Sequence, residues 1–96
     1  MNLRKKYKKR PVPVNVIYWD GSAEALEAIT EMVSESAYRM PDGKILHHDA
    51  LTQRLIIPTM ENPIEAEKGD YIIQGVVKEC YPCKPGVFAQ TYEEVQ

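Results

Sequence analysis

Residues 67–95 read EKGDYIIQGVVKECYPCKPGVFAQTYEEV, and this stretch decides the fold. The KGD run at residues 68–70 predicts a tight turn, because glycine accepts positive φ angles and aspartate bonds to nearby backbone. The YIIQ run at residues 71–74 alternates its side chains between two faces and is the most strand-like run in the chain. Three further features are expected after it: a bend or bulge at Gly75, a continuing or returning strand over residues 76–81, and a short helix over residues 87–95.

Another strand and the main helix are predicted near the start of the chain. Residues 12–19, VPVNVIYW, alternate with a period of two and are rich in β-branched and aromatic side chains, which predicts a strand. Pro11 and Pro13 have no N–H group, so the start of this strand belongs at a sheet edge or before regular pairing. Ser22 is a typical helix N-cap, and apolar residues three and four positions apart predict a helix over residues 22–36.

The middle of the chain predicts short strands joined by turns. The PDG run at residues 41–43 predicts a turn. Strands are expected over residues 44–46 and 51–60, with a marginal one over residues 64–67. Together these elements predict a single α+β domain over residues 11–96: a small, mostly antiparallel sheet with one main helix on one face and a short C-terminal helix.

Length and composition restrict the class of protein. A chain of 96 residues has room for one domain. No apolar run approaches the roughly 18 residues that span a bilayer, and no apolar stretch follows the charged start, so neither a membrane span nor a secretory signal is expected. We therefore expect a cytoplasmic protein with no membrane partner. Two cysteines are too few for a disulfide scaffold and are expected to be thiols.

The first ten residues form a basic arm on an otherwise acidic chain. The arm has no acidic residue and six basic ones: Arg4, Lys5, Lys6, Lys8, Lys9 and Arg10. The other 86 residues hold the remaining six basic residues and all 14 acidic ones, a net charge of −8. The arm, which we expect to be flexible, has three interpretations: it binds nucleic-acid phosphates, it docks on an acidic protein surface such as its own, or it is a solvated tail. Tyr7 could stack on a base, but one aromatic residue is weak support.

The predicted helix carries an acidic stripe, whose members lie three or four residues apart: Glu24, Glu27, Glu31 and Glu35. Like charges at this spacing repel each other mildly. The stripe is either a solvated helix face or a docking surface for a basic partner, including the chain's own arm.

The CYPC sequence at residues 80–83 has three interpretations. A thioredoxin-like pair lies at a helix N-terminus near a βαβ unit, whereas this pair follows a strand late in the chain. A structural zinc site needs four ligands, and His47 and His48, as neighbours in a strand, would point to opposite faces. The third interpretation, two buried or half-buried thiols at Cys80 and Cys83, is the one we favour. We expect no catalytic residue, no metal and no cofactor.

Both ends of the chain resemble a family of short phage and prophage proteins. Its members start with a basic arm and a strand similar to KPVxVEAxxWxG, which is matched here by residues 10–14 and 17–21. They end in a segment similar to PGDxIIxGxxGExYPCKPDIFxxTYE, which is matched by residues 68–75, 79–88 and 91–93. The resemblance implies a small protein encoded by a phage or an integrated prophage, in a family without an assigned activity.

The C-terminal motif can be explained by folding alone. Its residues form the turn, stiffen the strand exit and cap the sheet: Gly69, Asp70, Tyr81, Pro82, Cys83, Pro85, Phe88 and Tyr92. This chain departs from the family pattern at Lys68, Cys80 and Gly86, where the family has proline, an aromatic or other apolar residue, and aspartate. The departure at Cys80 argues against a function for the paired cysteines.

We therefore expect a non-enzymatic phage or prophage accessory protein that binds a host or phage macromolecule in the cytoplasm of an infected or lysogenic bacterium. A protein partner is favoured, and an inhibitor of a host defence or host enzyme is one such role. One alternative is a nucleic-acid-binding module that uses the basic arm. A second alternative is a thiol or zinc protein that uses Cys80 and Cys83. Formation of a homodimer through an edge strand is a further alternative.

Overall fold

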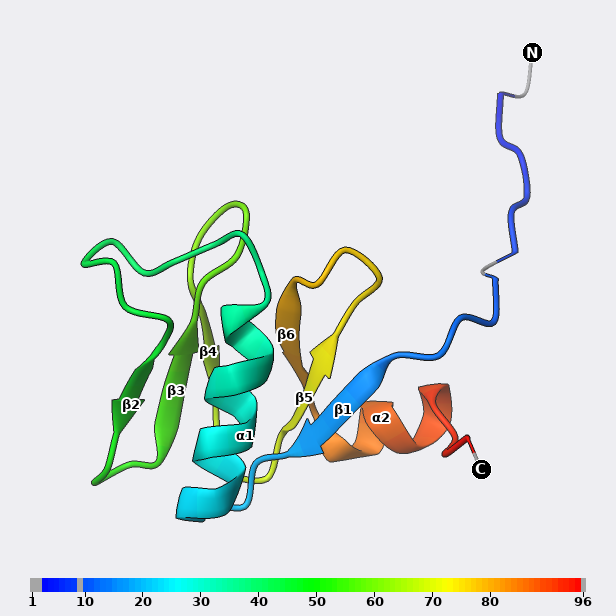
Figure 1. The fold of residues 1–96 in the computed structure, drawn as a ribbon. Helices are drawn as coiled ribbons and strands as arrows, with labels where there is room; N and C mark the ends of the chain where they lie inside the picture. The colour runs from blue at the N-terminus through cyan, green and yellow to red at the C-terminus, as the bar shows by residue number, and fades with distance from the viewer. Residues whose placement is uncertain (1–2, 9, 96) are drawn as a thin grey trace.

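The computed structural model describes residues 3–8 and 10–95 (Figure 1). Along the chain its elements are β1 (Asn15–Tyr18), α1 (Ala23–Ser34), β2 (His47–Asp49), β3 (Arg54–Ile57), β4 (Ile64–Ala66), β5 (Tyr71–Gln74), β6 (Cys80–Cys83) and α2 (Pro85–Thr91). The predicted α+β class, with antiparallel strands, one main helix and a short C-terminal helix, is confirmed.

The strands are divided between two antiparallel sheets of three strands each. The first sheet has the order β1-β5-β6 and the second has the order β2-β3-β4. β4 lies beside β6, so the sheets are neighbours, and α1 lies over both of them on one side (Figure 1).

The hydrophobic core lies between α1 and the two sheets. As predicted, Ser22 caps the helix: its side-chain oxygen accepts the N–H of Ala25 at 3.0 Å. The core side chains come from the helix and from both sheets: Trp19, Ile29, Met32, Val33, Leu55, Ile57, Ala66, Ile72 and Cys80. Removing this apolar surface from water is the main favourable term for a domain of this size.

The first sheet is covered on its other face by α2. The side chains of Tyr71 and Ile73 point away from α1, because neighbouring residues in a strand alternate between faces. The Phe88 ring stacks on Tyr71 with a centroid distance of 3.9 Å, and Tyr92 stacks on Phe88 at 5.2 Å. Ile73 is fully buried on this face. The first sheet is therefore packed on both sides.

Several predicted bounds were wrong. β1 begins at Asn15 rather than at residue 12, because the prolines before it cannot donate to a sheet. α1 ends at Ser34 rather than at residue 36. α2 begins at Pro85 rather than at residue 87, since the fixed φ of proline suits the first helical position. It ends at Thr91, because the next residue has an extended backbone.

The strands in the middle of the chain also differ from their prediction. Residues 44–46 form no strand, and Ile45 and Leu46 instead pack against the core from a loop. The strand follows them as β2. β3 occupies only four residues of the predicted range 51–60. A turn precedes it, in which an Asp49 carboxylate oxygen accepts the N–H of Leu51 at 2.9 Å.

Gly75 opens a hairpin turn and forms no bulge. Its N–H donates to the Glu79 carbonyl at 2.9 Å, and its carbonyl accepts the N–H of Lys78 at 3.0 Å. Lys78 adopts a φ of 72°. Of the two predicted alternatives for residues 76–81, the returning strand is therefore the observed one, and it begins at Cys80.

Candidate functional site

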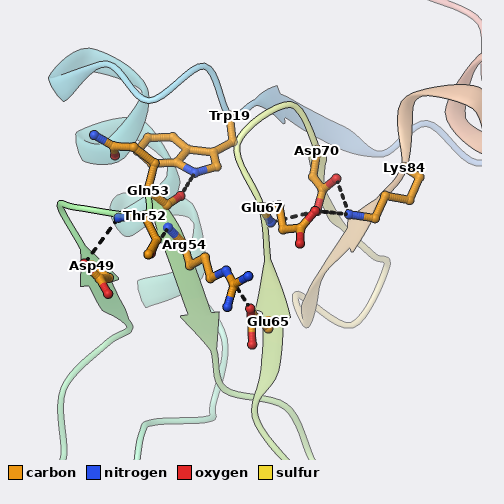
Figure 2. Close-up of polar contacts among 9 residues, drawn as sticks. All are labelled: Trp19, Asp49, Thr52, Gln53, Arg54, Glu65, Glu67, Asp70 and Lys84. Carbon is orange, nitrogen blue, oxygen red and sulfur yellow. Dashed lines mark hydrogen bonds and ion pairs between the residues drawn. The ribbon is translucent and has the colours of Figure 1, made fainter.

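The motif residue Asp70 joins the turn before β5 to the exit of β6 (Figure 2). Its carboxylate is buried, accepts the backbone N–H of Glu67 at 2.9 Å and pairs with the Lys84 ammonium at 3.0 Å. Hydrogen bonds to Asp70 and then to Glu67 raise the pKa of Lys84 above its ordinary value. Gly69, with a φ of 100°, donates its N–H to the Trp19 carbonyl at 2.8 Å. These contacts give the motif a structural role.

Trp19 connects β1 to the turn between β2 and β3 (Figure 2). Its indole N–H donates to the carbonyl of Gln53 at 2.6 Å, and Gln53 itself has a φ of 62°. In the second sheet, the Arg54 side chain on β3 forms an ion pair with the Glu65 carboxylate on β4 at 3.1 Å. Trp19 thus holds the two sheets together at the end where α1 begins.

The two cysteines of the CYPC sequence do not converge on one point. Cys80 is opposite Gln74 in the sheet and Cys83 is opposite Tyr71, so their side chains lie on opposite faces. Both are free thiols, Cys80 buried and Cys83 half-buried. Burial, followed by the nearby charges of Glu35 and Glu79, raises the pKa of Cys80 to about 11. A thiol with such a pKa is a poor nucleophile at neutral pH.

The two histidines of β2 also have separate contacts. His47 Nε2 lies 2.8 Å from the Asp42 carboxylate, and His48 Nε2 lies 2.8 Å from the side-chain oxygen of Gln53. Within residues 3–8 and 10–95, no three His, Cys, Asp or Glu side chains are grouped as metal ligands would be.

The acidic stripe lies on the solvent side of α1. Its four glutamates are exposed: Glu24, Glu27, Glu31 and Glu35. Glu35, at the C-terminal end, is 3.9 Å from the Lys78 ammonium of the β5–β6 hairpin. The stripe is thus an open anionic surface along the helix.

The described part of the basic arm, residues 3–8 and 10, extends away from the folded body and does not run along α1 (Figure 1). Its described cationic side chains are exposed: Arg4, Lys5, Lys6, Lys8 and Arg10. Lys9, also predicted as a binding residue, lies outside the described residues. Arm and acidic stripe are therefore separate surfaces in this structure.

A groove of about 640 Å³ lies between the segment before β1 and the C-terminal end of the chain. The aromatic rings of Tyr71, Phe88 and Tyr92 line it together with the apolar residues that lead into β1. Glu93 and Glu94 also line it and supply negative charge.

The tip of the β5–β6 hairpin exposes two adjacent apolar side chains. Val76 is 70% exposed and Val77 is 74% exposed. Met60, on the loop between β3 and β4, is 67% exposed, and its N–H donates to a Glu79 carboxylate oxygen at 3.2 Å. This hydrogen bond links the loop to the hairpin, and both segments expose apolar side chains. We define Met60, Val76 and Val77 as the valine tip.

Sequence reasoning missed the valine tip because Val-Val next to an apolar run was interpreted as strand. The available signal was the interval between Gly75 and the charged pair Lys78-Glu79, which is short enough for a hairpin turn. It also missed the Asp70–Lys84 pair, since nothing local relates these two positions.

Comparisons with protein-family models, curated proteins and solved structures found no match. The resemblance to phage and prophage proteins therefore stays a hypothesis. None of the helices in the described parts of the chain has the length and apolar character that crossing a membrane requires.

Proposed function

We propose that this chain is a non-enzymatic accessory protein of a phage or prophage, which binds a protein partner through the valine tip. The observation that supports this proposal is the exposure of Val76 and Val77 at a hairpin turn. Turn positions favour glycine, proline, asparagine, aspartate and serine, each for a conformational reason. Two valines at these positions have no such folding role, so a contact with another molecule is the better explanation.

The geometry of the hairpin suits a preorganised contact. Both flanking strands pack in the first sheet, and the turn is closed by backbone hydrogen bonds of 2.9 and 3.0 Å. Little conformational entropy is then lost when a partner covers the tip. Complete burial of a valine side chain contributes about 1.5–3 kcal/mol, so Val76 and Val77 can supply the apolar centre of a small interface.

The class of partner follows from the resemblance, which supports a host or phage protein. Inhibition of a host defence or a host enzyme is the role that we propose for such a complex. This step rests on analogy with the source and not on chemistry at the tip.

The proposal is tested by a pull-down from bacterial lysate with nuclease present. We expect a protein that the wild-type chain retains and that Val76→Ser/Val77→Ser loses. The matched control is Leu51→Ser, because Leu51 is 96% exposed on the turn between β2 and β3. Retention by the double variant would contradict the proposal, as would equal loss in the control. Far-UV circular dichroism checks that all variants keep the fold.

A nucleic-acid-binding module is the second candidate. The exposure of the described arm cations supports it, because an extended cationic segment can follow a phosphate backbone. It predicts recovery of nucleic acid that disappears when residues 1–10 are deleted. It also predicts that binding weakens as salt is added. The logarithm of the binding constant should fall linearly with the logarithm of the salt concentration, with a slope of about −0.9 for each phosphate contacted on a duplex. A nucleic-acid affinity that changes neither with salt concentration nor on deletion of residues 1–10 would refute this candidate.

A further inference from the structure

Within residues 3–8 and 10–95, no strand lies beside one long side of β1. β1 is the terminal strand of the first sheet and pairs with β5 on its other side. The N–H of Trp19 donates to the Asp70 carbonyl at 2.9 Å, so this residue faces β5. Backbone groups in an antiparallel strand alternate between the two sides, and therefore Asn15 and Ile17 also face β5. Val16 and Tyr18 direct their N–H and C=O groups to the open side, as does Val14 where the extended chain continues.

This open side is not protected in the usual ways. Natural edge strands carry prolines, charges or bulges that prevent pairing with another chain. Pro11 and Pro13 lie at odd-numbered positions, as do the residues whose backbone faces β5. The prolines therefore remove N–H groups on the side of β5 and none on the open side. All three open-side residues, Val14, Val16 and Tyr18, keep an N–H group and are uncharged. Tyr18 is 48% exposed.

We propose that two copies of this chain pair antiparallel through the open side of β1, with the basic arm of each copy against the acidic stripe of the other. A two-fold axis through Val16 places Val16 opposite its own copy and Val14 opposite Tyr18 of the second copy. The backbone N–H and C=O groups of all these residues face the open side. A single register therefore lets every opposed pair form backbone hydrogen bonds. The two first sheets then form one continuous six-stranded sheet.

The groove supports a second copy as the occupant. Val14 and Val16 line it, and their side chains lie on the face that α2 covers. In the proposed register Tyr18 of the second copy lies beside Val14, on that same face. Its ring therefore covers apolar surface that the single chain leaves open.

Charge supports the same arrangement. In an antiparallel pair the arm of one copy passes the end of β1 in the other, where Asp20 and the first turn of α1 with Glu24 follow. Ten extended residues span about 33 Å, whereas a helix of the length of α1 spans about 18 Å, so the arm can follow the whole stripe. Residues 3–8 and 10 of the arm lie apart from the acidic stripe of their own chain (Figure 1), and pairing brings opposite charges together.

The test is the molar mass of the full chain in solution, measured by light scattering after size exclusion over a range of concentrations. We expect twice the 11.0 kDa of one chain. Val16→Pro should shift the mass to that of one chain, because it removes the central open-side N–H without removing a bond to β5. Val16→Thr keeps this N–H and should stay dimeric. A wild-type monomer at every concentration would overturn the proposal, as would a proline variant that pairs as strongly as wild type.

The arm is tested in the same assay. Higher salt and the deletion of residues 1–10 should each raise the dissociation constant at least tenfold, and a dimer indifferent to both would overturn the role of the arm. Should the proline variant fail to fold, amide exchange of the wild type decides the matter. The Val16 and Tyr18 amides should exchange more slowly as concentration rises, whereas the Val77 amide should not. Equal behaviour of all three would refute pairing at β1.

Discussion

Replacement of Trp19 by phenylalanine should destabilise the fold by about 2–3 kcal/mol. Trp19 is fully buried, and its indole N–H donates to the Gln53 carbonyl at 2.6 Å. Phenylalanine removes this donor and leaves a partly buried carbonyl without its partner, which costs about 1 kcal/mol. The smaller ring also loses packing and leaves a cavity, which costs roughly 1–2 kcal/mol. A 96-residue domain has a stability of about 5–14 kcal/mol, so the loss is large.

Urea unfolding followed by circular dichroism measures this change. With a slope of about 1.5 kcal/mol per molar urea, the midpoint should fall by about 1.3–2 M. Tyr18→Phe is the matched control, because Tyr18 is the neighbouring aromatic residue and is 48% exposed. Its midpoint should stay within about 0.3 M of wild type, since surface changes rarely exceed 0.5 kcal/mol. Equal midpoints for the two variants, at one protein concentration, would refute the role of Trp19 between the sheets.

Three further outcomes are expected. Gly69→Ala should lower stability by at least about 1 kcal/mol in a thermal melt, because Gly69 has a φ of 100°. The control is Gly86→Ala in α2, where no atom lies within 4 Å of the added carbon. This variant should be as stable as wild type or more stable. Iodoacetamide at neutral pH should modify Cys83 well before Cys80, and mass spectrometry should find both modified only after denaturation; faster labelling of Cys80 would contradict its burial. Because the pKa of Cys80 is raised to about 11 in the folded state, its contribution to stability is complete below the ordinary value of 9.0 and is lost as pH rises through about 11. Cys80→Ala should therefore show a smaller decrease in stability over that range of pH, and an unchanged profile would count against this assignment.

Local features of the fold were predictable from the sequence. The turn before β5 and the bounds of β5 agree with the prediction, because Gly69 and the YIIQ run act over a few residues. Ser22 marked the start of α1 for the same reason, since a cap needs only its neighbours three positions on.

The division into two sheets was not predictable, because strand partners are set by packing between distant segments. β2 illustrates this: its HHD sequence has little strand character, and its pairing with Leu55 and Ile56 of β3 decides its conformation. The candidate surfaces follow the same rule. Exposure of the described arm cations could be expected from their charge, but the open side of β1 depends on the order β1-β5-β6.

The pairing of β1 with β5 has a consequence for synthesis. Asn15 and Gln74 are bonded partners 59 positions apart, whereas β2, β3 and β4 are close neighbours in sequence. At a translation rate of about 5–20 residues per second, β1 therefore stays unpaired for roughly 3–12 s before β5 has been synthesised. The second sheet can form locally during this interval, while contacts of high sequence separation come last. An apolar strand that waits unpaired is prone to aggregation, and the basic arm and two prolines directly before it are the kind of residues that keep such a segment soluble.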